Sequence, residues 1–262
     1  KRKRGVDERI AAAEKVMKLY FGLLPEMRTI HPQHPLAPDE CTFLLQQSFV
    51  SLDASARASV RSYVEHLMRR DLVPDYRYYR RQLQLLAWQE RGEHWVLKSP
   101  VHLLALGPLL EVFPDACIVQ THRAPREVIP SLCSLTTLMR KLFVKKRDAE
   151  RVGEDILTWW GALLDRGLAD RARADEARFF DVNYGELLDD PLGAVRRIYA
   201  HFGYPFSAEM EARIERWLRD NPQDKHGIHR YSASQFGLTD DAIDRRFAAY
   251  MERFGLDRRR AA

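Results

Sequence analysis

Short apolar runs that end in polar loop residues organise the central part of the chain. Trp95–Leu97 and Ala116–Gln120 are each followed by cations and then by an apolar segment with helical spacing, and Arg178–Val182 is a third such run. Runs of this length between helical segments predict the strands of a parallel α/β sheet. Ligands bind outside the carboxyl ends of such strands, so the side chains after each run are the first candidates for chemistry.

Helical spacing of apolar residues dominates the rest of the chain, and no repeat or low-complexity linker divides it. The segment 7–89 reads as helical throughout, whereas 94–256 alternates helices with short strands, so we expect a single α/β domain over residues 1–262. The segments predicted to be helical are Asp7–Tyr20, Cys41–Val50, Ser55–Arg70, Tyr76–Gln89, Leu135–Arg147, Asp155–Arg171, Leu192–Phe202 and Asp240–Phe254.

The net charge does not indicate a nucleic-acid partner. The formal charge is +5, but Lys1–Arg4 and Arg258–Arg260 hold seven of the positive charges, which leaves the body with −2. Basic tails of this kind favour solvated termini over a nucleic-acid arm. No apolar run reaches the roughly 20 residues that span a bilayer, so we expect no stable membrane insertion.

The cysteines and the early histidines give no sign of a metal site. Cys41, Cys117 and Cys133 are odd in number and widely spaced, which predicts buried free thiols in a reducing, cytoplasmic setting. His31 and His34 stand in a proline-rich loop without cysteine or carboxylate partners, and we expect them to bind no metal.

Arg123 and Ser131 form the first candidate site. The guanidinium follows the second apolar run, and the hydroxyl stands eight positions later, near the expected start of a helix. Both groups can reach one phosphate, with help from the helix N-terminus. In the alternative, Arg123 pairs with Glu127 and Ser131 only tolerates the turn made by Pro125 and Pro130. Spacing alone leaves both interpretations open.

Lys98 and His102 form the second candidate site, at the end of the first run. A lysine there suits the stabilisation of charge on a transferred group, and a nearby histidine suits the removal of a proton from an attacking hydroxyl. The alternatives are a solvated lysine and a histidine satisfied by backbone groups, and spacing alone favours that alternative for His102. Glu40 and His122 are the secondary candidates for a base.

Segments of the chain resemble the bacterial branch of the sulfotransferases that use 3′-phosphoadenosine 5′-phosphosulfate (PAPS). They are WVLKSPVHL, FPDACIVQTHRAPREVIPSL, VNYGELLDDP and NPQDKHGIHRYSASQFGL, and the similarity extends from Asp7 to Leu256. The resemblance implies a three-layer, P-loop-like α/β fold with a short parallel sheet and many helices. It further implies transfer of the sulfuryl group of PAPS to a hydroxyl or amine of a small-molecule, lipid or glycan acceptor, with 7–89 on the acceptor side and 94–256 on the nucleotide side.

The resemblance also implies roles for particular residues. Arg123 and Ser131 match the pair that holds the 3′-phosphate of the cofactor in that family. Lys98 matches the lysine that contacts the transferred sulfuryl group, and His102 is the best match to the base. Tyr184 matches a tyrosine near the nucleotide. The family's late basic loop, which closes over the 3′-phosphate and the adenine, corresponds to Lys225, His226 and Gly227.

One element of the family has no counterpart in these residues. The family opens with a strand and a loop like PRSGTT that cradles the 5′-phosphosulfate, whereas the only early glycines here are Gly5 and Gly22. We therefore expect a sheet without its opening strand, and weak binding of the desulfated nucleotide 3′-phosphoadenosine 5′-phosphate (PAP) without transfer. A non-catalytic nucleotide- or partner-binding relative is the main alternative. A nucleoside or sugar kinase is a weaker one, because the glycine-rich kinase loop is missing too.

Overall fold

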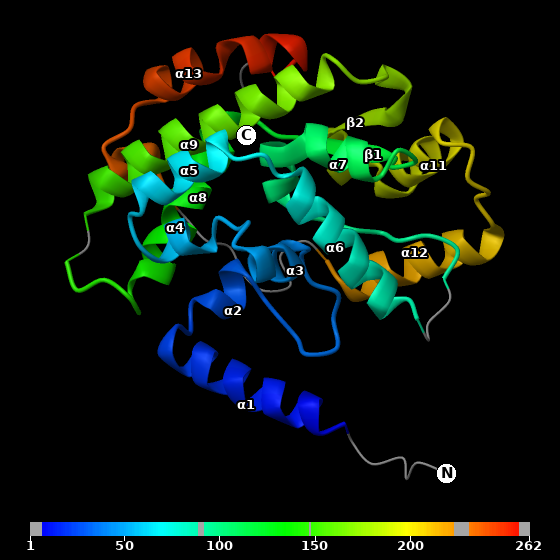
Figure 1. Cartoon of the computed structure of the whole chain (residues 1–262), viewed down its shortest axis with the longest axis horizontal. Helices are drawn as coiled ribbons and strands as arrows, with labels where there is room; N and C mark the ends of the chain where they lie inside the picture. Colours follow the sequence, from blue (N-terminus) through cyan, green and yellow to red (C-terminus); the bar gives the residue numbers. More distant parts are fainter. Residues whose placement is uncertain (1–6, 89–91, 147, 223–230, 257–262) are drawn as a thin grey trace.

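A small parallel sheet lies among many helices in the computed structural model of the chain, which describes residues 7–88, 92–146, 148–222 and 231–256 (Figure 1). The strand β1 (Ile118–His122) pairs with β2 (Phe179–Asn183), and His122 stands opposite Asn183. Both strands therefore end at the same edge of the sheet. The expected α/β class with a short parallel sheet and many helices is confirmed.

The first predicted strand is wrong, whereas the other two are present within two residues of their expected bounds. Trp95–Leu97 is not a strand, and these side chains are 51, 86 and 41 % exposed. Within the described residues the sheet contains only β1 and β2, and this run pairs with neither of them. Apolar composition does not produce a strand when the ladder of hydrogen bonds has no partner. The run is instead tied to the front of the chain, where the Cys41 amide donates to the Lys98 carbonyl at 3.0 Å.

The front of the chain is helical, in shorter pieces than expected. The side chain of Asp7 caps the first helix by accepting from the Arg9 amide. The helix expected over 41–50 stops early because Phe49 has a left-handed backbone, with φ of 59°, and the helix expected over 55–70 is broken by the extended residue Ala58. The helices are α1 (Glu8–Leu23), α2 (Met27–Ile30), α3 (Thr42–Leu45), α4 (Asp53–Arg57), α5 (Arg61–Arg69) and α6 (Val73–Leu86), with a 3₁₀ turn, η1 (Gln46–Ser48), after α3.

The second part of the chain supplies the sheet and the remaining helices (Figure 1). The expected helix over 135–147 is wrong in both bounds: it begins at Pro125, whose ring suits the first helical position, and ends at Arg140. The elements are η2 (Pro100–Ala105), α7 (Leu106–Val112), α8 (Pro125–Arg140), α9 (Ala149–Arg171), η3 (Glu176–Arg178), α10 (Tyr184–Asp189), α11 (Pro191–His201), α12 (Ala208–Asp220), η4 (Ala233–Phe236) and α13 (Asp240–Arg253).

The core has a main cluster and a second one under the last helix. The main cluster packs α6, η2, α7 and α9 around side chains such as Tyr76, Leu104 and Leu163. In the second cluster η4 lies so close to α9 that a Cβ on Gly153 would stand 2.1 Å from the Phe236 carbonyl oxygen, so this position requires glycine. Burying these side chains supplies most of the free energy of folding.

The prediction of buried thiols holds for two of the three cysteines. Cys41 and Cys133 are buried in the main and second clusters, and both are free. Cys117 is exposed, which corrects the expectation. It precedes β1 at the surface, where its sulfur lies 3.8 Å from the hydroxyl of Tyr204.

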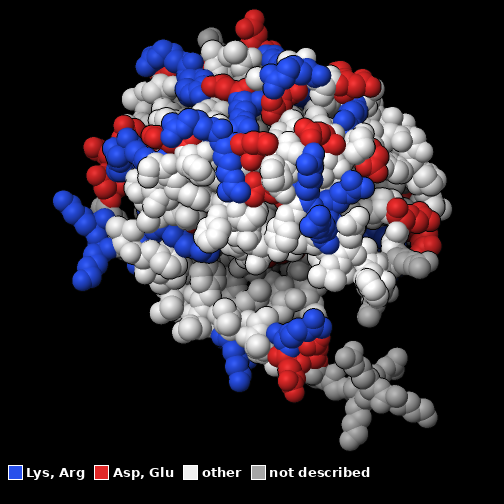
Figure 2. Space-filling model, viewed as in Figure 1, with Lys and Arg blue, Asp and Glu red and all other residues white. Residues whose placement is uncertain are grey.

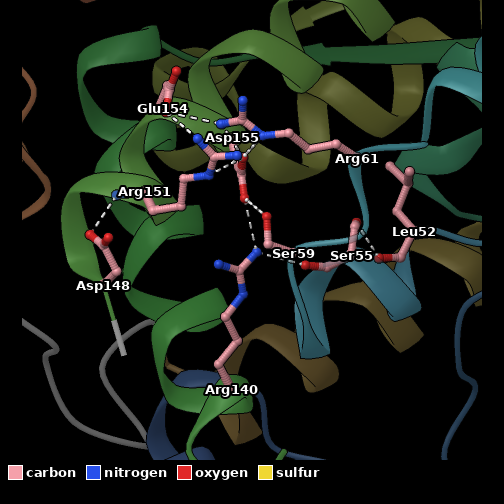
Figure 3. Close-up of polar contacts among 9 residues, drawn as sticks. All are labelled: Leu52, Ser55, Ser59, Arg61, Arg140, Asp148, Arg151, Glu154 and Asp155. Carbon is pink, nitrogen blue, oxygen red and sulfur yellow. Dashed lines mark hydrogen bonds and ion pairs between the residues drawn. The ribbon is translucent and has the colours of Figure 1, made fainter. Parts of the chain in front are cut away.

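A buried carboxylate ties the front helices to the long helix α9 (Figure 3). Asp155 is fully buried; its Oδ1 accepts from Arg61 Nε at 2.9 Å, and its Oδ2 accepts from Ser59 Oγ at 2.8 Å. Arg140, at the end of α8, donates to Asp155 Oδ2 at 3.3 Å and to the Ser55 carbonyl at 3.0 Å. The side chain of Arg140 is itself only 7 % exposed. The positive charges of the arginines offset the cost of burying the negative charge of Asp155. We therefore assign this cluster to the stability of the fold.

The visible surface carries both signs of charge. In Figure 2 lysines and arginines alternate with aspartates and glutamates over the upper part of the face, without a continuous basic stripe. Among the described helices, none combines the length and the apolar character that a membrane span requires. The described histidines, cysteines and carboxylates form no group of three that would suit a metal ion.

Candidate functional site

Arg123 and Tyr184 meet at the carboxyl ends of the two strands. Arg123 directly follows β1, and Tyr184 is the first residue of α10, directly after β2. Because the strands are parallel and His122 pairs with Asn183, the residues that follow them lie side by side. The guanidinium carbon of Arg123 lies 4.5 Å from the centroid of the Tyr184 ring, a cation–π contact. A planar cation thus stands where open parallel sheets bind ligands.

The pairing of Arg123 with Glu127 is also present. Arg123 Nε donates to Glu127 Oε2 at 2.6 Å, and the two side chains are 38 and 55 % exposed. An exposed ion pair one helical turn apart contributes only up to about 1 kcal/mol, so an anionic ligand can displace it. Within the described chain the two Nη groups of Arg123 donate no hydrogen bond to the protein. They remain available to a phosphate.

Ser131 stands further along the helix than we expected. Because α8 begins at Pro125, Ser131 lies in its second turn and is only partly exposed. Six residues of helix place it about 9 Å along the axis from the first helical residue, so the N-terminal amides of α8 do not point at its hydroxyl. No hydrogen bond joins Ser131 to Arg123 in the described structure. A ligand that contacts both side chains has to lie along the first turns of α8.

Lys98 lies beside Glu40. The candidate for charge stabilisation is thus in contact with a secondary candidate for the base. The ammonium group donates to Glu40 Oε1, and the neighbouring backbone bond between Cys41 and Lys98 holds the two segments together. The side chain of Lys98 is 73 % exposed, whereas that of Glu40 is 21 % exposed. Lys98 is therefore accessible to a ligand, and Glu40 fixes the direction in which its charge points.

His102 is held at one ring nitrogen by Tyr76. The residue belongs to η2, where the Ser99 side chain accepts from the Val101 amide at 3.3 Å, and the hydroxyl of Tyr76 on α6 lies 2.8 Å from His102 Nδ1. Burial lowers the pKa of His102 to about 4 and raises the pKa of Tyr76 above its usual range. Both groups are neutral at pH 7. Since Nδ1 is occupied, Nε2 is the only ring nitrogen of His102 that can exchange a proton with a substrate.

The two candidate sites make no direct polar contact with each other in the described residues. No hydrogen bond or ion pair links Lys98 or His102 to Arg123, Ser131 or Tyr184 within the part of the chain that is placed. Lys225, His226 and Gly227 lie outside the described residues.

His122, the other secondary candidate for a base, is occupied at both ring nitrogens. Nε2 lies 2.7 Å from Asp181 Oδ1 and Nδ1 lies 2.9 Å from the Tyr250 hydroxyl. The side chain is only 2 % exposed, and its ring stacks on Phe254 with centroids 3.9 Å apart. A histidine so enclosed cannot receive a proton from a substrate hydroxyl, which corrects that expectation.

The partners of these candidates carry almost no signal in the sequence. Tyr250 reaches His122 from a helix 128 positions later, and Tyr76 reaches His102 from 26 positions earlier. The tyrosine cluster around Tyr76 is visible in the sequence, but periodicity indicates packing and not its contact with His102. Asp181 is the exception: it is the single carboxylate in the predicted strand Arg178–Val182, and a charged residue in such an apolar run indicates a polar partner.

Comparison with known proteins identifies relatives of the chain. Residues 2–208 match the family model described as "Sulfotransferase family". Curated relatives include the omega-hydroxy-beta-dihydromenaquinone-9 sulfotransferase Stf3 of Mycobacterium bovis and of Mycobacterium tuberculosis. Each is 27 % identical over 167 residues, which are 62 % of this chain and 41 % of the relative. The chain thus spans less than half the length of these relatives.

Solved sulfotransferase structures are similar to the chain over nearly its whole length. The crystal structure of sulfotransferase STF9 from Mycobacterium avium has a TM-score of 0.79 at 32 % identity and covers 90 % of this chain and 64 % of its own. That of STF1 from Mycobacterium tuberculosis has a TM-score of 0.74 at 33 % identity and covers 93 % of this chain and 66 % of its own. These similarities show that the fold is shared over most of the chain.

Proposed function

The chain belongs to the sulfotransferase family, and from that premise we propose that it binds PAPS and directs its sulfuryl group to an acceptor hydroxyl or amine. The observation that carries the proposal is the meeting of Arg123 and Tyr184 at the carboxyl ends of β1 and β2. A partly exposed guanidinium stacked on an aromatic ring suits a nucleotide phosphate, because its planar fork makes paired hydrogen bonds to oxyanions.

We assign the 3′-phosphate of the nucleotide to Arg123 and Ser131. The free Nη groups of Arg123 donate to the phosphate, while the weak pair with Glu127 opens at little cost. The hydroxyl of Ser131 adds a neutral contact from the second turn of α8. The ring of Tyr184 holds the guanidinium in place beside the nucleotide. The loop of Lys225, His226 and Gly227 stays a prediction as the cover of this site.

We assign the transfer step to the residues around Lys98. PAPS supplies the sulfuryl group, and the exposed ammonium of Lys98 stabilises the negative charge that builds up on the bridging and sulfuryl oxygens. His102 takes the acceptor proton at Nε2, which requires the tautomer in which Nδ1–H donates to the Tyr76 oxygen. Its pKa of about 4 keeps it unprotonated at neutral pH. Glu40 orients Lys98 and is the alternative base.

We further propose that the acceptor is an alcohol on an apolar molecule, bound by the helical part 7–89. The name of the Stf3 relatives describes a hydroxylated menaquinone as the acceptor of those proteins. In this chain the helical part exposes large apolar side chains, which supply surface for such a molecule: Val16, Leu19, Leu23, Leu36, Phe43 and Phe49. A cytoplasmic location stays a prediction.

Binding and transfer are tested separately, because no PRSGTT-like loop stands among the 262 residues. Titration calorimetry with PAP is expected to detect binding, and adenosine 5′-monophosphate (AMP) is expected to bind more weakly. Transfer from labelled PAPS is then measured with a panel of a lipid alcohol, a phenol, an amine and a glycan. Binding of PAP without transfer to any acceptor supports the non-catalytic alternative, and equal affinity for PAP and AMP overturns the phosphate site.

Where transfer is detected, Lys98→Ala and His102→Ala are expected to lower turnover more than PAP affinity. A contact made mainly in the transition state has this effect. Arg77→Ala, on α6, is the control for the loss of an exposed cation. Unchanged turnover in His102→Ala moves the role of base to Glu40.

A further inference from the structure

A cavity of about 200 Å³ lies where the end of α8 meets the start of α9. Its lining comes from α8, from residues that follow α8, from the first turns of α9 and from Ser59, between α4 and α5. A water molecule needs roughly 10–15 Å³ of such space, so the cavity can hold a polyatomic ion. No residue of the two candidate sites lines it. The cavity is therefore a feature of its own.

Two side chains of α8 that line the cavity have a polar atom without a partner. Thr137 Oγ1 and Arg140 Nε make no hydrogen bond within the described residues. Arg140 donates to the described protein through Nη2 alone, toward Asp155 and the Ser55 carbonyl (Figure 3). Its side chain is 7 % exposed. A buried donor without a partner destabilises a fold, so a ligand that accepts from these groups is favoured.

The positive charge around Arg140 exceeds the negative charge that faces it. Asp155 pairs with Arg61 at 2.8 Å and with Arg140 at 3.3 Å, and Arg151 lies 3.7 Å from it. Glu154 pairs with Arg61 and Arg151 as well. Three guanidinium groups thus share two carboxylates. One positive charge in this cluster has no counter-charge.

The other charged groups of the lining do not remove this excess. Lys141 is neutralised by Glu26, with Nζ 2.7 Å from Oε1. Lys146 has no ion pair or hydrogen bond within the part of the chain that the structure describes. Asp148 is the single carboxylate of the lining, and its Oδ1 accepts from the Arg151 amide to cap α9. Lys146 and Asp148 balance each other in charge, so the excess from the arginines remains.

We propose that this cavity binds one small inorganic oxyanion, phosphate or sulfate. Such an ion presents several acceptor oxygens to the Thr137 hydroxyl, the remaining N–H groups of Arg140 and the ammonium group of Lys146. Its negative charge offsets the excess of positive charge. Because only the folded chain brings α8, α9 and Ser59 together, the bound ion stabilises the fold. The inference does not depend on the proposed function.

Titration with inorganic phosphate at constant ionic strength tests the site, with amide chemical shifts followed by nuclear magnetic resonance. The Arg123→Ala variant is used, so that phosphate bound at the proposed nucleotide site does not contribute. Sodium chloride keeps the ionic strength constant, so a general effect of salt does not contribute either. We expect saturable shifts at the amides of residues 137–146 and 148–152. Absent shifts at these amides, or shifts that rise without saturation, overturn the inference.

Lys146→Ala and Lys145→Ala form a matched pair in the same background. Both variants remove an exposed lysine from the same loop, and only Lys146 lines the cavity. We expect Lys146→Ala to raise the dissociation constant of phosphate about threefold to tenfold, as the loss of one contact to an ion does. Lys145→Ala is expected to leave it unchanged. Equal dissociation constants in the two variants contradict the inference.

Thr137→Val separates contact with the ion from a role in the fold. The hydroxyl has no partner in the described protein, so its removal breaks no hydrogen bond there. Without phosphate, we expect the free energy of unfolding in urea to stay the same or to rise. Phosphate binding is expected to weaken about threefold to tenfold. A lower free energy of unfolding together with unchanged phosphate binding assigns the hydroxyl to the fold and overturns its place in the site.

Discussion

Arg140 and Arg123 lie at the two ends of α8, and their surroundings differ in nearly every respect. Arg140 is 7 % exposed and donates to the fully buried Asp155 and to a backbone carbonyl. Arg123 is 38 % exposed and has an exposed glutamate and the face of a tyrosine as neighbours. A buried cation is tolerated only when it is compensated, so Arg140 belongs to the fold. Arg123 is weakly compensated and open to solvent, so its charge can serve a ligand.

The contrast gives a criterion that residue type alone does not give. Both arginines have a carboxylate partner, and a list of ion pairs would treat them alike. Exposure and the remaining hydrogen-bonding capacity separate them. The same criterion separates the histidines: His122 is bonded at both nitrogens, whereas His102 keeps Nε2.

The largest expected effect is the loss of the buried carboxylate. Asp155→Asn keeps the size of the side chain but leaves Arg61 and Arg140 without its charge. We expect the free energy of unfolding in urea to fall by about 3–5 kcal/mol. Glu154→Gln, next to it and 59 % exposed, is the control and is expected to cost less than about 1 kcal/mol. Equal losses of unfolding free energy in the two variants would contradict the distinction between buried and exposed ion pairs.

A change of pH has the next largest effect, through His102. Its pKa is lowered by burial to about 4 in the folded chain, whereas the unfolded chain takes up this proton near pH 6.5. Above pH 6.5 this histidine therefore costs the fold nothing. As the pH falls from 6.5 toward 4, it lowers the free energy of unfolding, by about 3 kcal/mol at most. The free energy of unfolding in urea is measured at several pH values in this range. We expect it to depend less on pH in His102→Gln than in His66→Gln, which changes an exposed histidine. Parallel pH curves for the two variants would refute the burial of His102.

The smallest expected effect is that of Ser131→Ala on PAP binding. The variant removes a neutral hydroxyl in the second turn of α8, and we expect a loss of about 0.5–1.5 kcal/mol, measured by calorimetry. Ser62→Ala, on an exposed face of α5, serves as control. A loss as large as that of Arg123→Ala would make the hydroxyl, and not the guanidinium, the main contact.

The sequence predicted the parts of the fold that local pattern determines. Ile118–His122 and Phe179–Asn183 were found within two residues because short β-rich runs between turns have few other solutions. The strand predicted at Trp95–Leu97 was wrong. A strand forms only when it pairs with a neighbouring strand, and a local pattern of residues does not show whether such a neighbour is present. Ala58 and Phe49, which divide the front helices, carry no strong signal for breaking a helix.

For the candidate site, the sequence supplied residues but not their neighbours. Arg123 and Tyr184 each follow a strand, and parallel pairing brings them together, a contact that spacing did not indicate. The partners of the two histidines come from distant elements: Tyr76 on α6 contacts His102, and Tyr250 on α13 contacts His122. Such contacts arise when helices pack on the sheet, and single-sequence periodicity does not reveal which side chains then meet.

The most direct test of the account is the binding of PAP and AMP to Arg123→Ala by calorimetry. Arg57→Ala is the matched control, since Arg57 also pairs with a carboxylate one turn away, Asp53, and lies over an aromatic ring, that of Phe143. The account predicts that Arg123→Ala weakens PAP binding by about 1.5–3 kcal/mol and leaves AMP binding unchanged, while Arg57→Ala changes neither. Equal weakening of PAP and AMP, or no weakening of PAP, would contradict the assignment of the 3′-phosphate to Arg123.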